Sequence, residues 1–178
     1  MGDGDDNVDS RGVYSPFVID DLVYGKDVIG DPVLLDLLAH PGFLRSKGLD
    51  QFGPPRDWWW CDGFSRYDHG IGAMLLVRRC HGSVQEQAAA LLHDASNRAF
   101  SHVYDWVFGR KHDEGGQDED HYHQLCRLGL SSVLDRHGLD TGAVADVKSF
   151  PLLEQPAPAL CADPVSYTHL TLPTKRIV

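Results

Sequence analysis

The sequence predicts an all-α protein built from a single domain. Its 178 residues are enough for one hydrophobic core and are short for two. The shares of hydrophobic residues (42%) and charged residues (24%) are ordinary for a globular protein. Apolar residues recur at helical spacing in several segments, and residues that begin or end helices stand between these segments. Wherever the pattern is clear, it is helical.

The N-terminal region is the least helical part of the sequence. Residues 1–12 are acidic and rich in glycine, so we expect a disordered tail there. Residues 13–29 mix β-branched and aromatic residues in short pieces that are typical of strands. Asp31, as an N-cap, and Pro32, as the first helical residue, then predict a helix whose leucines continue until Pro41 ends it.

Two further helices are expected in the centre of the chain. Residues 52–65 contain two prolines and three consecutive tryptophans, which favours an ordered loop. The helix after this loop ends at His81 and Gly82. Ser83 and Glu86 form a predicted capping box, which begins the next helix.

The second half of the chain predicts two more helices. Residues 100–108 form a short helix, and the charged residues 109–118 form a loop. One long helix then carries Tyr122 and a series of apolar residues on one side and ends at His137 and Gly138.

The C-terminal residues differ from the rest of the sequence. From residue 165 onward the apolar residues show no clean periodicity. Residues 166–174 resemble translated sequencing-adapter sequence, which is a contaminant of assembled transcripts. We therefore expect residues 13–163 to form a domain that is truncated at its C-terminus, and residues 164–178 to be a non-native tail.

The overall charge limits the partners of the protein. With 26 acidic and 16 basic residues the net charge is −10, which repels a long nucleic acid. A small phosphate ester remains compatible, because a metal ion and a few arginines dominate at short range. The sequence shows neither a secretory signal nor a membrane-spanning run, so we expect a cytoplasmic or nuclear protein without a membrane partner. It leaves a homo-oligomer open.

Histidine and aspartate residues in the centre of the chain are candidate metal ligands. His93 and Asp94 are adjacent on a predicted helix and point about 100° apart, so they converge only on an ion beyond the helix edge. His69 can approach this ion from the preceding helix, because the turn between the two helices is short. Such ligands suit Mn, Fe, Zn, Ni or Mg. A histidine taken alone is more often a hydrogen-bonded helix residue than a ligand.

The surrounding motifs resemble the HD superfamily of metal-dependent phosphohydrolases. Residues 65–72, 90–94 and 99–102 match this superfamily in order, spacing and residue type. The resemblance is closest to the branch related to deoxynucleotide triphosphohydrolases. It extends over residues 17–163 and includes the segments 31–35, 45–49, 122–123 and 160–163.

The resemblance implies an HD-type helical fold and a divalent metal ion held by His69, His93, Asp94 and Asp163. The metal would activate a water molecule that hydrolyses a phosphate ester or a nucleotide, with deoxynucleoside triphosphates as one class of substrate. The resemblance also implies catalytic roles for three further residues. Arg66 would lie beside the phosphates, and His102 and His123 would serve as hydrogen-bond donors or acid–base groups near the leaving oxygen.

Two departures from the family pattern count against activity, and the first of them favours an alternative. Asn97 replaces the second histidine of the family's His-Asp-x-x-His element, and an amide does not take up a proton at working pH. Pro164 follows Asp163 where the family has a basic residue. The alternative function is a catalytically inactive HD module that binds a nucleotide or a structural partner. In that case Arg66 would be a surface residue in a salt bridge, and the two catalytic histidines would be structural.

Overall fold

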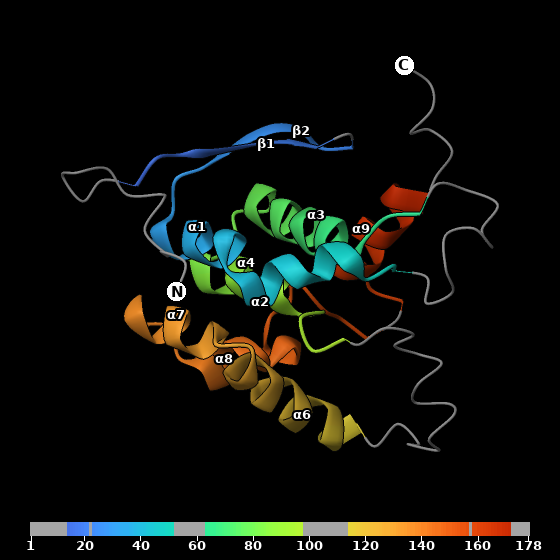
Figure 1. The fold of residues 1–178 in the computed structure, drawn as a ribbon. Coiled ribbons are helices and arrows are strands. Elements are labelled where there is room, and N and C mark those ends of the chain that lie inside the picture. Colours follow the sequence, from blue (N-terminus) through green and yellow to red (C-terminus); the bar gives the residue numbers. More distant parts are fainter. Residues whose placement is uncertain (1–13, 22, 52–62, 98–113, 157, 172–178) are drawn as a thin grey trace.

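The computed structural model describes residues 14–21, 23–51, 63–97, 114–156 and 158–171, and helices make up most of these residues (Figure 1). The prediction of a mainly α-helical protein is confirmed. The α-helices and two 3-10 helices, in chain order, are α1 (Pro32–Ala39), α2 (Pro41–Leu44), η1 (Arg45–Gly48), α3 (Arg66–Arg79), α4 (Val84–Leu92), α6 (Glu114–Arg127), α7 (Leu130–Arg136), α8 (Thr141–Ala145), η3 (Val147–Ser149) and α9 (Ala162–Thr171).

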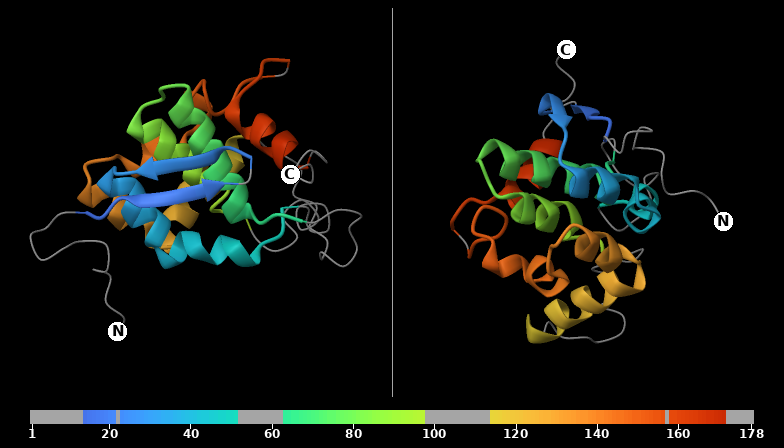
Figure 2. Two further views of the ribbon diagram at one scale, coloured as in Figure 1. Left: turned by 90° about the horizontal axis from the view of Figure 1, so that it is seen from above. Right: turned by 90° about the vertical axis from the view of Figure 1, so that its left-hand side faces the viewer.

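The pair α3 and α4 lies at the centre of the fold, as Figures 1 and 2 show. The two helices run in opposite directions, with β1 and β2 on one side of the pair and α6, α7 and α8 on the other. Gly70 of α3 lies against the backbone of α4, because a Cβ atom at this position would be 2.7 Å from the carbonyl oxygen of Leu91. A glycine therefore permits the close approach of the two helices.

The predicted strand-like segment forms an antiparallel hairpin of β1 (Phe17–Asp21) and β2 (Gly25–Ile29). Gly25, the first residue of β2, is in the left-handed region, with φ of 72°, which a glycine adopts without strain. Ile19 and Ile29 are buried against the helices. This hairpin is the only sheet among the residues that the structure describes.

The turn between α3 and α4 satisfies the backbone groups at the end of α3. The N–H of His81 donates to the carbonyl of Arg78 over 3.0 Å, and the N–H of Gly82 donates to the carbonyl of Val77 over 2.9 Å. This is a Schellman motif, so the predicted end of α3 is confirmed. His81, rather than the glycine, has the left-handed conformation, with φ of 61°.

Two of the predicted helix starts differ in detail. The reciprocal capping box is at Ser65 and Asp68, where each side chain accepts from the other residue's backbone N–H, at the start of α3. Ser83 caps α4 as predicted, but the Glu86 carboxylate accepts from the backbone N–H of Leu152 instead of returning to Ser83. The side chain of Asp31 does not cap α1, because it forms an ion pair of 2.8 Å with Arg78.

The prediction of one long helix after Tyr122 is wrong. Two helices, α6 and α7, are separated at Gly129, whose φ of 79° is incompatible with a continuous helix. Both helices bury apolar residues, so the apolar spacing continues across the break. The predicted loop at residues 109–118 is wrong from Glu114 onward, where α6 begins. The short helix predicted at residues 100–108 lies outside the described residues.

Two features near Pro41 and the C-terminus also differ from the expected pattern. Pro41 ends α1 but begins α2 in the same step, because proline is tolerated as the first helical residue. The segment without clean periodicity is helical as far as Thr171 and lies against α3. Its buried positions are four residues apart, as in a helix, but Ala162 is small and Ser166 is polar, so they give little apolar signal in the sequence. The assignment of residues 164–178 to a non-native tail stays a prediction.

The substitution Gly70→Ala tests the contact between α3 and α4. Helix propensity alone predicts a gain of about 1 kcal/mol when alanine replaces a glycine in a helix. We expect instead a loss of about 1–3 kcal/mol in the free energy of unfolding, since the added methyl group meets the Leu91 carbonyl. Urea denaturation measures the difference. Gly48→Ala is the matched control, because a Cβ atom there meets nothing within 4 Å; equal effects of the two substitutions would contradict the prediction.

Candidate metal centre

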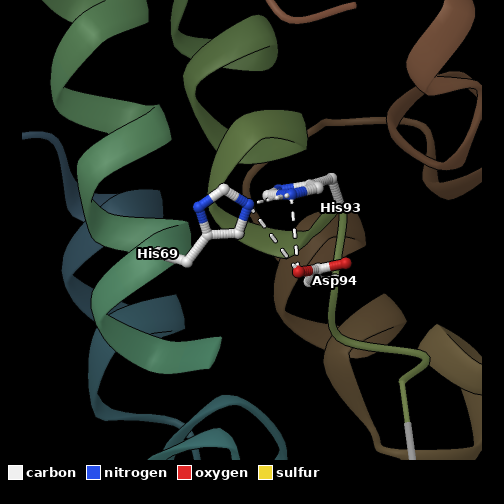
Figure 3. Close-up of side chains that lie close together, drawn as sticks. All are labelled: His69, His93 and Asp94. Carbon is white, nitrogen blue, oxygen red and sulfur yellow. Dashed lines mark hydrogen bonds and ion pairs between the residues drawn. The ribbon is translucent and has the colours of Figure 1, made fainter. Parts of the chain in front are cut away.

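Four of the predicted site residues come together from three parts of the chain. His69 is the fourth residue of α3, His93 follows the last residue of α4, Asp94 comes next, and Asp163 lies in the first turn of α9. Figure 3 shows His69, His93 and Asp94 pointing toward one another. The Nε2 atoms of His69 and His93 are 3.1 Å apart, and the Nε2 atom of His69 is 2.9 Å from Oδ1 of Asp163.

The distances between these atoms fit a single metal ion. Oδ2 of Asp94 lies 3.8 Å from Nε2 of His69 and 3.7 Å from Nε2 of His93, and Oδ1 of Asp163 lies 3.5 Å from Nε2 of His93. With metal–ligand bonds of about 2.1 Å, neighbouring ligand atoms are about 3.0 Å apart in an octahedral site and about 3.4 Å apart in a tetrahedral one. The observed separations between each aspartate oxygen and the two Nε2 atoms lie close to both values. The donor atoms of His69, His93 and Asp94 all lie within 4.8 Å of one another, so these three residues could hold a small divalent ion, and Asp163 lies beside both imidazoles.

The hydrogen bond on the far side of the His93 ring sets the tautomer of this candidate ligand. The Nδ1 atom of His93 is 2.8 Å from the carbonyl oxygen of Ala90, which only accepts, so Nδ1 carries the proton and donates. The lone pair of Nε2 then points at His69. Two imidazole nitrogens at 3.1 Å repel each other when both present lone pairs, so either a hydrogen on one nitrogen or a metal ion must lie between them.

The carboxylates make the centre attractive to a cation. Burial lowers the pKa of His93, but Asp94 and Asp163 outweigh it and raise this pKa to about 9. Burial opposes the charge on Asp94, yet His93, Arg66 and His69 lower its pKa. The pKa of Asp163 is also well below its usual range, because hydrogen bonds to His69 and His93 outweigh its burial. Without a metal, the centre therefore holds a proton on His93 that a metal ion would replace.

Arg66 lies beside the four candidate ligands and is buried, so the alternative expectation of a surface residue is wrong. It is only 3% exposed, and its Nη1 atom is 2.5 Å from Oδ2 of Asp94. Its Nη2 atom donates to the carbonyl oxygen of Gln51 over 3.4 Å. The guanidinium therefore balances the charge of Asp94 from the protein side.

The downstream histidines are placed differently from the candidate metal ligands. His123 is exposed on α6, where its ring meets the edge of the Tyr122 ring. His121, two residues earlier, is 6% exposed, and the sequence analysis overlooked it. Its spacing of four residues from the buried Leu125 places both on one face of α6, which is the signal that could have revealed it. His102 lies outside the described residues.

Comparisons with known proteins identify relatives of the chain. No family model matches it. It is 36% identical over 151 residues to the metal-dependent phosphohydrolase cns2 of Cordyceps militaris, a match that covers 84% of this chain and 43% of that protein. It is 27% identical over 161 residues to the deoxynucleoside triphosphate triphosphohydrolase SAMHD1 homolog of Dictyostelium discoideum, covering 81% of this chain and 30% of that protein. The predicted relationship to HD-type phosphohydrolases is confirmed.

The chain is also 40% identical over 161 residues to the uncharacterized protein YdhJ of Bacillus subtilis, a match that covers 84% of this chain and 46% of YdhJ. The chain thus spans less than half the length of each of these relatives. Among its described residues, no helix combines the length and the apolar character that crossing a membrane requires.

The pKa of His93 predicts how the stability of the metal-free chain depends on pH. The folded-state value of about 9 lies above the ordinary value of 6.5, so protonated His93 stabilises the fold fully below pH 6.5. This contribution is lost as the pH rises from 6.5 through about 9. Urea denaturation in EDTA should therefore give a free energy of unfolding that falls across this range.

Two controls accompany the pH series. His93→Gln should flatten the dependence between pH 6.5 and 9, because glutamine does not titrate. The lowered pKa values of Asp94 and Asp163 act in the opposite direction and cost stability only as the pH falls below about 4, so they do not overlap with the effect of His93. A wild-type chain whose stability stays constant from pH 6.5 to 9 would disprove the prediction.

Proposed function

We propose that the chain carries the metal centre of a phosphohydrolase, which hydrolyses a phosphate ester or a nucleotide. One observation carries the proposal: an oxygen of Asp94 and an oxygen of Asp163 each lie 2.9–3.8 Å from the Nε2 atoms of both His69 and His93, and these two nitrogens are 3.1 Å apart. The names of two relatives, a metal-dependent phosphohydrolase and a triphosphohydrolase homolog, support the same chemistry.

The proposed metal ligands are His69, His93, Asp94 and Asp163, and Mn, Fe, Zn, Ni and Mg are the ions that such ligands suit. When bound, the metal would lower the pKa of a water molecule and neutralise charge on a phosphoryl oxygen. The Ala90 carbonyl keeps His93 in the tautomer that leaves Nε2 available. Arg66 stabilises the charged form of Asp94, since its guanidinium is fixed against one carboxylate oxygen.

The proposed substrate is a small phosphorylated molecule. The net charge of −10 disfavours a long nucleic acid. A bound metal ion and Arg66 would supply positive charge only at short range, which suits a small phosphorylated molecule. A deoxynucleoside triphosphate is one member of the proposed class. His102 and His123 remain our proposed hydrogen-bond donors or acid–base groups near the leaving oxygen, on the basis of the family resemblance.

A second function, nucleotide binding without turnover, is favoured by two observations. Asn97 replaces a residue that transfers protons in the family pattern. Arg66 is already paired with Asp94 at 2.5 Å, so it is not aimed at a substrate phosphate in this arrangement. Parallel measurements of nucleotide binding and phosphate release separate the two functions, because an inactive module binds without releasing product.

The substitutions His93→Ala and Asp94→Ala test the metal centre directly. Each removes one ligand, so we expect the bound metal to fall from about one ion per chain to background and phosphate release to disappear. Metal content is measured by mass spectrometry after purification, and phosphate release with a panel of nucleotides. His81→Gly is the control, since it removes an exposed imidazole at the end of α3. Full metal content in the His93 and Asp94 variants would overturn the proposal.

A pair of substitutions on α6 tests the predicted role of His123. If His123 takes part in proton transfer, His123→Gln should lower kcat about 10²- to 10⁴-fold with unchanged metal content and unchanged Tm. His121→Gln should chiefly lower Tm, because His121 is buried in the fold. The reverse result, a loss of kcat with His121→Gln alone at unchanged Tm, would move the catalytic role to His121.

A further inference from the structure

The turn that carries Asp94 is not supported by a regular helix. α4 ends at Leu92, and the next residues are held by short-range bonds from the N–H of Ala95 to the carbonyl of Leu92 (2.8 Å) and from the N–H of Asn97 to the carbonyl of Asp94 (3.0 Å). A turn of this kind allows more backbone movement than a helix does. The direction of the Asp94 carboxylate therefore depends on contacts from outside the turn.

One of these contacts comes from Arg45, which is 50 residues away in the sequence. From the start of η1, its Nη2 atom donates to the carbonyl oxygens of Ala95 (2.5 Å) and Asn97 (3.0 Å). A single nitrogen with two hydrogens can serve both acceptors. Arg45 therefore links η1 to the turn and holds the backbone at Ala95 and Asn97 in place.

Asn97 contacts the carboxylate itself. Its amide Nδ2 donates to Oδ1 of Asp94. The opposite orientation of the amide would place its oxygen against a carboxylate oxygen, which is repulsive, so the donor must face Asp94. The second oxygen, Oδ2, then lies toward Arg66 and the Nε2 atoms of His69 and His93. The amide thereby selects which oxygen of Asp94 faces the imidazoles.

We propose that Asn97 is a positioning residue, which holds Asp94 in its ligand orientation, and that Arg45 anchors the turn that carries both. The inference rests on the proposed function, because the orientation matters only if Asp94 binds a metal. It gives the replacement of the family's histidine a physical meaning. An amide at this position gives up proton transfer but keeps a hydrogen-bond donor on the ligand.

The inference is tested by metal affinity rather than turnover. Mn²⁺ and Zn²⁺ are each titrated into the metal-free chain by calorimetry, and Tm is measured separately in EDTA. Asn97→Leu, which removes the donor at similar volume, should weaken the binding of whichever ion the wild type binds by about 10- to 100-fold. Its Tm in EDTA should remain close to the wild-type value, a combination that a merely structural role would not give.

Further variants keep the test decisive if Asn97→Leu does not fold. Asn97→Ala removes the donor without adding volume, and Arg45→Met removes the anchor from a side chain that is largely exposed. Both should weaken metal binding, and Arg45→Lys should recover part of the loss caused by Arg45→Met. Lys47→Met, on the same 3-10 helix, and Gln155→Leu, an exposed amide that donates to the carbonyl of Pro151, are the controls.

The outcomes separate the inference from the proposed function. If the wild type binds an ion and the Asn97 variants bind it equally well, the role of Asn97 is disproved while the metal centre stands. If affinity falls in the Asn97 variants but not in Arg45→Met, the anchoring role of Arg45 is disproved. A wild type that binds neither Mn²⁺ nor Zn²⁺, and none of Fe²⁺, Ni²⁺ and Mg²⁺ in the same titration, overturns both the proposed function and the inference.

Discussion

The close contact between α3 and α4 is the constraint on which the rest of the site depends. Gly70 brings the two helices together, and the residue before it is His69. His93 follows the last residue of α4, so the same contact sets the distance of 3.1 Å between the two imidazole nitrogens. The buried alanines and leucines of α4, with almost no exposed surface, prevent the helix from adjusting by sliding. The geometry of the centre is therefore a property of the hydrophobic core.

Charge balance is the second requirement of the centre. Two buried imidazoles, two carboxylates and one guanidinium lie within a few ångströms, and each charge has an opposite charge beside it. A buried carboxylate without such partners would take up a proton and cease to be a ligand. Arg66 and His93 keep Asp94 ionised, and His69 and His93 do the same for Asp163. The neighbouring cationic side chains thus keep both carboxylates negatively charged, which is the form that binds a divalent ion.

Local signals explain what the sequence could and could not predict. The strand-like character of residues 13–29, the helical segments around His69 and His93 and the end of α3 follow from residue spacing and turn residues, which act over a few positions; the pairing of β1 with β2 was not predicted. The motifs also predicted four residues that the structure brings together. The break at Gly129 was missed, because α6 and α7 bury apolar residues in one continuous pattern. The partners of Arg66 and Arg45 lie 28 and 50 residues away, and no local pattern encodes such contacts.

The short turn at His81 and Gly82 has a consequence for the order in which the protein assembles. Because this turn joins α3 directly to α4, His69 and His93 are only 24 residues apart and belong to one helical hairpin. Contacts of low sequence separation close quickly during folding, whereas those of high separation close slowly. Asp163, which is 94 residues from His69, joins by the slower kind of contact. The imidazole half of the centre is thus encoded within a single folding unit, and the last carboxylate completes it when the C-terminal part of the chain docks.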